Sequence, residues 1–306
     1  MLTPLSAHAC ERYPRGTTAS VQERRIGDVT VSAIGLGAMP LSTKGDRPAR
    51  DDAVAVVHAA LDAGVTLIDT ADAYSRDEAE FGHNEALVAE ALASYGPGAA
   101  GVLVATKGGH TRQGTDWGLD GSPAYLRRAA EDSLRRLGGD SIGLYQYHRP
   151  DPATPWEASM GALRALVDDG LVRMVGVSNA DIAQIDVARS VIGNAFVAVQ
   201  NQFSPGWRFS GDELEHCAAH GLAFLPWSPF GGVSAAGSLD ATAPAFAEVA
   251  RELGVSVYRV TLAWHLARAD VVVPIPGASR ASSIRDSAAA ADLELTPDQL
   301  TRLDAG

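Results

Sequence analysis

Short apolar runs alternate with longer segments of helical period along almost the whole chain. After a predicted hairpin in RRIGDVTVSAIGLG, eight runs have the length of buried strands: VSAIGLG, TLID, VLVATK, IGLYQYH, VRMVGVSN, AFVAVQNQ, LAFLPWS and VVVPIPG. This alternation is typical of repeated βα units, whose parallel strands are covered on both faces. Eight such units in 306 residues favour a closed (β/α)8 TIM barrel with an N-terminal β-hairpin.

The segments between these runs carry helix signals. Ser122 followed by Pro123 predicts an N-cap and a first helical turn, and Gly138 predicts the end of that helix. The spacing of apolar residues predicts other helices over residues 51–63, 156–167 and 246–253, and an extra helix over residues 257–268 before the last strand. No linker or change of composition divides the chain, so we expect a flexible arm over residues 1–22 and one domain over residues 23–306.

A doubly wound nucleotide-binding sheet is the competing α/β architecture. It needs the pattern G-x-G-x-x-G after its first strand, where the third glycine lets helix and strand pack closely. The chain reads GLGAMP at that place, with Pro40 in the third glycine position. The sequence therefore favours the barrel.

Composition excludes several classes of function. The formal charge is −12 and no block of lysines or arginines occurs, which argues against a nucleic-acid or anionic-membrane surface. Cys10 and Cys217 are the only cysteines, too few for a disulfide framework, and no apolar run reaches the length of a membrane span. We expect a cytoplasmic protein that acts on small molecules and holds no metal.

In a (β/α)8 barrel, catalytic residues lie at the C-terminal ends of the strands. Polar or aromatic side chains stand at or just beyond six of the predicted strand ends: Asp69 and Tyr74, Lys107, His148, Ser178 and Asn179, Gln200, and Trp227 and Ser228. Lys107 is informative because only two of the 25 basic residues are lysines. A lysine in a buried strand can polarise a neighbouring group, which makes Lys107 a catalytic candidate.

Together these side chains provide a proton donor and a pocket for an oxygen atom, but no nucleophile. The ordinary tyrosine pKa is about 10, and an adjacent ammonium lowers it, so Lys107 would make Tyr74 a better acid. Asp69 would pair with Lys107, and His148 would orient a substrate oxygen or assist the proton transfer. Carbonyl reduction needs such a donor, with the hydride supplied by a cofactor. We interpret Arg149 and Asp151 as structural and Asp72 as a capping or turn residue.

From about Arg25 to its end, the chain resembles the aldo-keto reductase superfamily. The motifs that carry the resemblance are GLGAMPLS, GVTLIDTADAYS, FGHNEALVAEAL, VATKGG, LYQYHRPDP, GLVRMVGVSN, VQNQFS, PWSPFGGV and IPGASR. Nine motifs in one order are specific, although none is specific alone. The resemblance implies a (β/α)8 barrel whose bottom is closed by a hairpin, with Tyr74 as the general acid, Lys107 and Asp69 tuning it, and His148 orienting the carbonyl.

The resemblance also implies NADPH bound across the barrel mouth, with NADH the less favoured cofactor. Ser178, Asn179 and Gln200 would hold the nicotinamide carboxamide, Trp227 would stack on the ring, and the loop of Ser228, Pro229, Phe230, Gly231 and Gly232 would cover the pyrophosphate. Gly277, Ala278, Ser279 and Arg280 would hold the adenosine end, with Arg280 on the 2′-phosphate. Gly37, Ala38, Met39 and Asp69 complete the expected cofactor contacts, and Trp117 would form a wall of the substrate pocket.

The chain departs from the family pattern at two places. Asp286 and Ser287 stand where many relatives have a Glu-Asn pair for adenine, and Ser279 stands where some have a second basic residue.

The main hypothesis is an NADPH-dependent reductase of aldehydes or ketones. The alternatives are a cofactor-sensing accessory subunit similar to potassium-channel β-subunits, and a hydrolase using Asp69 with Asp72 or a metal. The substrate and the choice between monomer and homo-oligomer stay open, because pocket walls come from variable loops, here residues 111–121 and 205–211 and the C-terminal tail.

Overall fold

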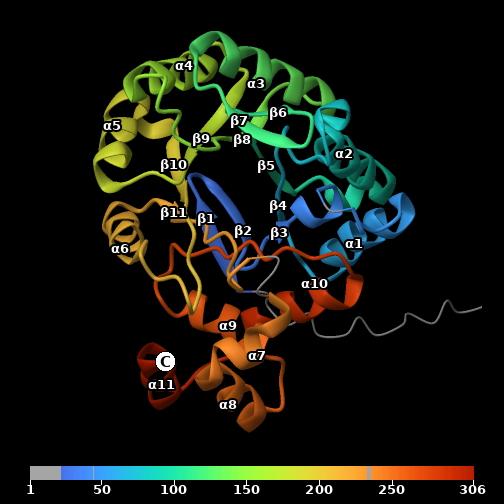
Figure 1. The fold of residues 1–306 in the computed structure, drawn as a ribbon, viewed down its shortest axis with the longest axis vertical. Coiled ribbons are helices and arrows are strands. Elements are labelled where there is room, and N and C mark those ends of the chain that lie inside the picture. Colours follow the sequence, from blue (N-terminus) through green and yellow to red (C-terminus); the bar gives the residue numbers. More distant parts are fainter. Residues whose placement is uncertain (1–21, 44, 233–235) are drawn as a thin grey trace, which may run out of the picture.

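The computed structural model describes residues 22–43, 45–232 and 236–306, in which a curved parallel sheet lies inside a ring of helices (Figure 1). Within these ranges the sheet has seven strands in the order β11-β10-β9-β8-β5-β4-β3. In chain order they are β3 (Leu36–Gly37), β4 (Leu67–Asp69), β5 (Leu103–Gly108), β8 (Ile142–Tyr147), β9 (Val172–Ser178), β10 (Phe196–Gln200) and β11 (Ala223–Phe224). The predicted α/β barrel architecture is confirmed.

Residues 271–277 close the sheet between its two edges. The Phe224 amide donates to the Val271 carbonyl at 2.9 Å, and the Gly37 amide donates to the Pro276 carbonyl at 3.0 Å. We expected a regular eighth strand here, but the segment pairs only through isolated bridges. Pro274 and Pro276 explain the difference, because proline has no N–H with which to continue a ladder.

The helices lie outside the sheet, mostly one after each strand. They are α1 (Arg50–Asp62), α2 (His83–Tyr95), α3 (Pro123–Leu137), α4 (Trp156–Asp168), α5 (Ile182–Ile192), α6 (Gly211–His220), α7 (Leu239–Thr242), α8 (Pro244–Leu253), α9 (Val257–Leu266), α10 (Ala281–Ala288) and α11 (Pro297–Ala305). The Tyr125 amide donates to Ser122 Oγ at the start of α3, and Gly138 follows its last residue, as predicted. Helix α9 is the extra helix expected before residues 271–277.

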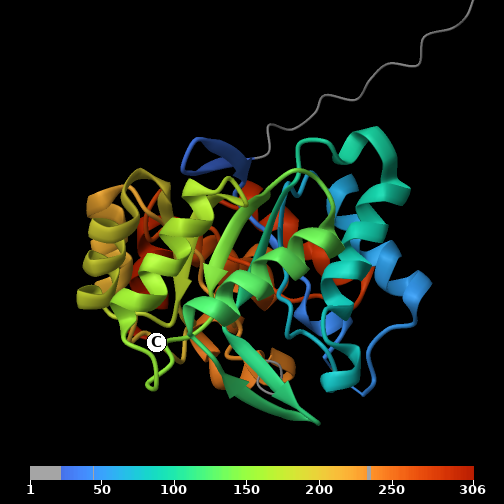
Figure 2. The ribbon, with the colours of Figure 1, turned by 90° about the horizontal axis from the view of Figure 1, so that it is seen from above.

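An antiparallel hairpin, β1 (Glu23–Ile26) with β2 (Val29–Ser32), covers one end of the barrel (Figure 2). Its Ile26 is fully buried and packs in one cluster with Leu144, Met174 and Val197, which come from the barrel strands. The hairpin therefore closes the floor, as expected. Of the arm predicted over residues 1–22, only Gln22 lies within the described residues, and Cys10 lies outside them.

A second hairpin projects at the opposite end, formed by β6 (His110–Gln113) and β7 (Asp116–Leu119) (Figure 2). We expected residues 111–121 to be a variable loop at the pocket, and most of this segment is an ordered hairpin. Thr111 pairs with Gly118 and Arg112 with Trp117, in antiparallel register. The local sequence offers no alternation of apolar and polar residues from which this ladder could be recognised.

Within the described ranges, no helix combines the length and the apolar character needed to cross a bilayer. The longest, α3, has 15 residues and carries charged side chains along its outer face. A membrane span needs about 20 mostly apolar residues.

The closure of the barrel depends on close backbone approach at Gly37. A Cβ there would lie 2.7 Å from the Ile275 carbonyl oxygen, whereas a Cβ on Gly161, inside α4, would meet nothing within 4 Å. We expect Gly37→Ala to lower the free energy of unfolding by about 1–3 kcal/mol through overpacking. Gly161→Ala should raise it by about 0.5–1 kcal/mol because alanine favours the helix. Urea denaturation measures both, and equal effects of the two substitutions would contradict the proposed closure.

Candidate active site

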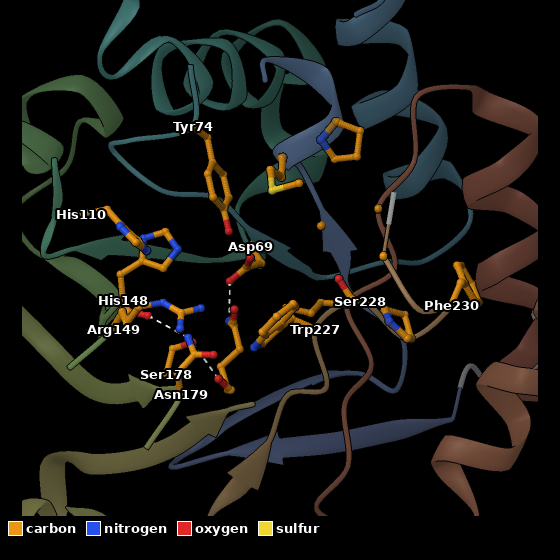
Figure 3. A pocket seen from close by; sticks show the side chains of 18 of the residues that line it. Asp69, Tyr74, His110, His148, Arg149, Ser178, Asn179, Trp227, Ser228 and Phe230 are labelled. Atoms are coloured by element: carbon orange, nitrogen blue, oxygen red, sulfur yellow. Dashed lines mark hydrogen bonds between the residues drawn. The ribbon is translucent and has the colours of Figure 1, made fainter. Parts of the chain in front are cut away.

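A pocket of about 260 Å³ opens at the C-terminal ends of the strands, at the end of the barrel away from the floor hairpin (Figure 3). Most of the residues predicted from the sequence line it: Gly37, Met39, Asp69, Tyr74, Trp117, His148, Ser178, Asn179, Gln200, Trp227, Ser228, Pro229, Phe230, Gly232 and Gly277. The barrel thus gathers residues from eight separate stretches of sequence around one cavity.

A buried ion pair lies at the base of this pocket. Lys107 Nζ donates to Asp69 Oδ2 at 2.6 Å, to the Thr70 carbonyl at 2.9 Å and to the Tyr74 hydroxyl oxygen at 3.0 Å. Lys107 is fully buried, so these three acceptors replace water for the three N–H groups of its ammonium. Asp69 and Tyr74 face the pocket, and Lys107 lies behind them.

Backbone pairing places Tyr74 over Lys107. Asp69 is the last residue of β4, and the chain beyond it stays attached to β5: the Thr70 amide donates to the Ala105 carbonyl at 2.8 Å, and the Asp72 amide donates to the Lys107 carbonyl at 3.2 Å. The loop then turns back, which puts the Tyr74 ring against the ammonium at 4.7 Å from its centroid. The tyrosine is therefore held by the same strand edge that supplies the lysine.

The second oxygen of Asp69 is held by two glutamines. Gln200 Nε2 donates to Asp69 Oδ1 at 2.9 Å, and Gln146 Nε2 donates to the same atom at 3.2 Å. Gln200 was predicted as a cofactor contact, whereas Gln146 was missed, although a glutamine inside the apolar run IGLYQYH was a signal. Both are buried, so the carboxylate oxygens of Asp69 are bonded on both sides.

The protonation of the pair differs from our expectation. Burial acts to lower the pKa of Lys107, but Asp69 and Tyr74 outweigh it and leave the pKa raised, so the side chain stays an ammonium. Burial raises the pKa of Tyr74, while Lys107 acts in the opposite direction without cancelling it. The expected net lowering of the tyrosine pKa was therefore wrong, because burial of the hydroxyl outweighs the nearby charge. Tyr74 keeps its proton at neutral pH.

His148 lies beside Tyr74, with the two ring centroids 5.5 Å apart and the rings edge to face. Burial lowers its pKa well below the ordinary value, and Lys107, His110 and Arg149 lower it further, so the imidazole is neutral. Its Nδ1 is buried without a partner among the described residues. Since an unpaired buried N–H is costly, the proton belongs on Nε2, where it can be donated into the pocket.

On the neighbouring wall, Ser178 and Asn179 follow β9. Asn179 has a positive φ of 60°, and its Nδ2 donates to the His148 carbonyl at 3.1 Å and to Ser178 Oγ at 2.9 Å. Ser178 Oγ donates in turn to the Gln200 carbonyl at 2.7 Å. These bonds fix the Asn179 amide at the pocket wall, while its Oδ1 acceptor has no partner among the described residues.

Trp227 and Ser228 form the wall that follows β11. The Trp227 indole packs against the barrel interior, and its Nε1 is buried without a partner within the described ranges. Ser228 has a positive φ of 50°, which turns the chain sharply into the loop that reaches Gly232. An aromatic face and a tight loop thus lie side by side at this edge of the pocket (Figure 3).

Of the residues expected at the adenosine end, Gly277 lines the pocket, whereas the buried Ala278 and the exposed Ser279 and Arg280 lie outside its lining, as do Ala38 and Gly231. Arg280 stands at the N-terminus of α10, exposed and with no ion pair among the described residues. Asp286 is engaged elsewhere: Arg259 Nη2 donates to it at 2.7 Å, and Ser256 Oγ donates to it at 2.5 Å. Ser279 is exposed beside Arg280, and Ser287 is buried.

Three interpretations of charged residues can be compared with the structure. Asp151 is structural as predicted, accepting from the amides of Gly121 and Ala153 at 2.9 Å. Asp72 lies in a turn, one of the two predicted alternatives, but its carboxylate is not a cap: it is fully buried without a hydrogen-bond partner among the described residues. Burial together with nearby Glu85 raises its pKa well above the ordinary value. Arg149, expected to be structural, lines the pocket.

His110 was also missed. Its ring lies 4.3 Å from that of His148 and 5.2 Å from that of Trp117, so it links the projecting hairpin to the base of the pocket. Trp117 is about half exposed and carries the Arg112 guanidinium over its face at 4.2 Å.

No group of three or more His, Cys, Asp or Glu side chains suited to a metal occurs within the described residues.

Comparison with known proteins relates this geometry to a family. The chain is 38% identical over 270 residues to the 6-dehydroglucose reductase of Novosphingobium aromaticivorans, covering 86% of this chain and 87% of that protein. It is 34% identical over 284 residues to an uncharacterised oxidoreductase of Schizosaccharomyces pombe, covering 92% of this chain and 88% of the relative. Both relatives are matched along most of their length.

A similar solved structure is an aldo/keto reductase from Klebsiella pneumoniae in complex with NADP and acetate. It superposes with a TM-score of 0.76 at 27% identity and covers 92% of this chain and 94% of the other. The sequence model of the Aldo/keto reductase family matches residues 33–306, which include every strand end that lines the pocket. The chain therefore belongs to the aldo/keto reductase family.

Proposed function

We propose that the protein reduces aldehyde or ketone carbonyls to alcohols with NADPH as the hydride donor. One observation carries the proposal: the Tyr74 hydroxyl lies at a pocket wall, 3.0 Å from the amine nitrogen of the fully buried Lys107. A reduced carbonyl oxygen needs a proton, and Tyr74 holds one at neutral pH. Asp72, the partner of Asp69 in the hydrolase alternative, lies outside the pocket lining.

Proton transfer from Tyr74 to the carbonyl oxygen leaves a tyrosinate. The Lys107 ammonium stabilises this anion as it forms, and Asp69 holds the ammonium at the position required. A neutral His148 donates through Nε2 to the same carbonyl oxygen, which orients it and favours the developing negative charge. Lys107 thus promotes catalysis by stabilising the tyrosinate that forms, more than by lowering the pKa of Tyr74 before the reaction.

The residues present fit a nicotinamide dinucleotide. Asn179 offers an amide oxygen and Trp227 an aromatic face at the pocket, while Arg280 offers a guanidinium at the N-terminus of α10; neither the Asn179 oxygen nor Arg280 has a partner within the described residues. These groups suit a carboxamide, an aromatic ring and a phosphate, respectively. When bound, NADPH supplies a hydride to the carbonyl carbon. The relative crystallised with NADP supports this choice of cofactor.

The relative named 6-dehydroglucose reductase supports small carbonyl compounds as the substrate class. We further propose a single catalytic domain over residues 23–306 and a cytoplasmic location, which fits a chain with two cysteines, one of them the buried Cys217.

We expect Tyr74→Phe to lower kcat for aldehyde reduction by about 10²–10⁴-fold, because it removes the proton donor and keeps the ring. NADPH binding, measured by quenching of protein fluorescence, should be retained. Tyr95→Phe is the matched control, since the Tyr95 hydroxyl donates to Asp62 on the exposed surface. Full turnover by Tyr74→Phe would rule out its role as the acid.

Lys107→Met should lower the free energy of unfolding by about 3–5 kcal/mol, because it leaves the Asp69 carboxylate buried without its countercharge. Adding Asp69→Asn should recover about half of that loss or more, since the stranded charge is then gone. Activity should stay absent in the double variant. Urea denaturation and steady-state kinetics separate the two effects, and restored activity would show that the ion pair is structural only.

Arg280→Met should raise the Kd for NADPH by about 10-fold and change that for NADH by less than about twofold, because only NADPH carries the 2′-phosphate. Arg25→Met, an exposed arginine on the floor hairpin at the other end of the barrel, is the control. Fluorescence titration of each variant with each cofactor is the measurement. Equal weakening for both cofactors would remove Arg280 from the phosphate site.

A further inference from the structure

One guanidinium at the pocket has no role in the reaction described above. Arg149 directly follows His148 beyond the end of β8, and it lines the pocket with an exposed side chain. Within the described part of the chain, it forms neither a hydrogen bond nor an ion pair. Figure 3 places it on the same side of the pocket as His110 and His148.

The charges around the pocket make this cation distinctive. Among the described lining residues, Asp69 and Arg149 are the only ones with charged side chains, and Asp69 is neutralised by Lys107. Burial keeps His110 and His148 neutral, and Arg149 contributes to the lowering of both pKa values. The pocket of a chain with a net charge of −12 therefore carries a local positive charge.

This positive charge reaches the reacting atoms. The His148 ring is 5.5 Å from that of Tyr74 and 4.3 Å from that of His110. The two histidines whose pKa values Arg149 lowers therefore lie next to the proton donor, Tyr74. Trp117 and Trp227 contribute aromatic faces to the same cavity. An unpaired arginine beside apolar walls is suited to a small molecule with an apolar body and an anionic end.

Resting on the carbonyl reduction proposed above, we propose that Arg149 is a specificity-determining residue that binds the carboxylate of carbonyl substrates carrying one. The planar fork of the guanidinium matches the two oxygens of a carboxylate. The carbonyl group of the same molecule then lies toward Tyr74 and His148. Neutral carbonyl compounds enter the same pocket without this contact.

The test compares two pairs of aldehydes that differ only in charge: 3- and 4-formylbenzoate against 3- and 4-formylbenzamide. For each pair, kcat/KM is measured with saturating NADPH, and the ratio of benzoate to benzamide is taken. Any effect on cofactor binding or on the chemical step cancels in this ratio, because both aldehydes share them. Using two ring positions allows for the unknown span between the carbonyl and the carboxylate.

Arg149→Met should lower the ratio by about 10-fold for at least one pair, the size expected for a lost charge-assisted hydrogen bond. Arg149→Lys, which keeps the charge but not the fork, should give an intermediate ratio. Arg251→Met, an exposed arginine on α8 outside the pocket lining, should keep the wild-type ratio. A ratio unchanged in Arg149→Met for both pairs would overturn the proposal.

A binding measurement separates failure of this inference from failure of the proposed function. Benzoate and benzamide are titrated against the NADPH-bound wild type and Arg149→Met, and the shift in Tm is recorded. If the wild type reduces no aldehyde, the proposed reduction is wrong, and the carboxylate site is judged by this shift alone. A benzoate-specific shift lost in Arg149→Met supports the site, and an equal shift in both proteins overturns it.

Discussion

The ion pair between Lys107 and Asp69 is the interaction on which the site depends. Burying two charges costs several kcal/mol each unless every donor and acceptor is satisfied. Here the ammonium has three acceptors, and the carboxylate is bonded by Lys107 on one oxygen and by Gln146 and Gln200 on the other. These side chains come from β4, β5, β8 and β10, so the pair is stable only when all four strands are in register.

The same burial sets the chemistry of the neighbouring groups. It keeps the Tyr74 hydroxyl protonated and the His148 imidazole neutral, while the carboxylate keeps Lys107 charged. The cavity therefore presents two neutral hydrogen-bond donors, Tyr74 and His148, beside the fixed positive charge of Lys107. That arrangement favours an oxygen that gains negative charge, and the donors are already in place before any substrate arrives.

Much of the fold could be predicted because it follows from local pattern. Short apolar runs located the barrel strands, and the cap at Ser122 and the stop at Gly138 located a helix. The predictions were wrong where backbone pairing did not follow the pattern of apolar residues. Prolines interrupt the ladder of residues 271–277, and the β6–β7 hairpin forms from a segment without alternating polarity.

The sequence by itself determined which side chains stand at the strand ends, because the barrel places every such end at one mouth. It thereby indicated Asp69, Tyr74, Lys107 and His148 together. Only the tertiary structure decided how their environments act. It set the net direction of the Tyr74 pKa, the burial of the Asp72 carboxylate and the lack of a partner for Arg149 among the described residues. Each of these depends on the atoms around a group, because burial and charge at one point are sums over residues far apart in the chain.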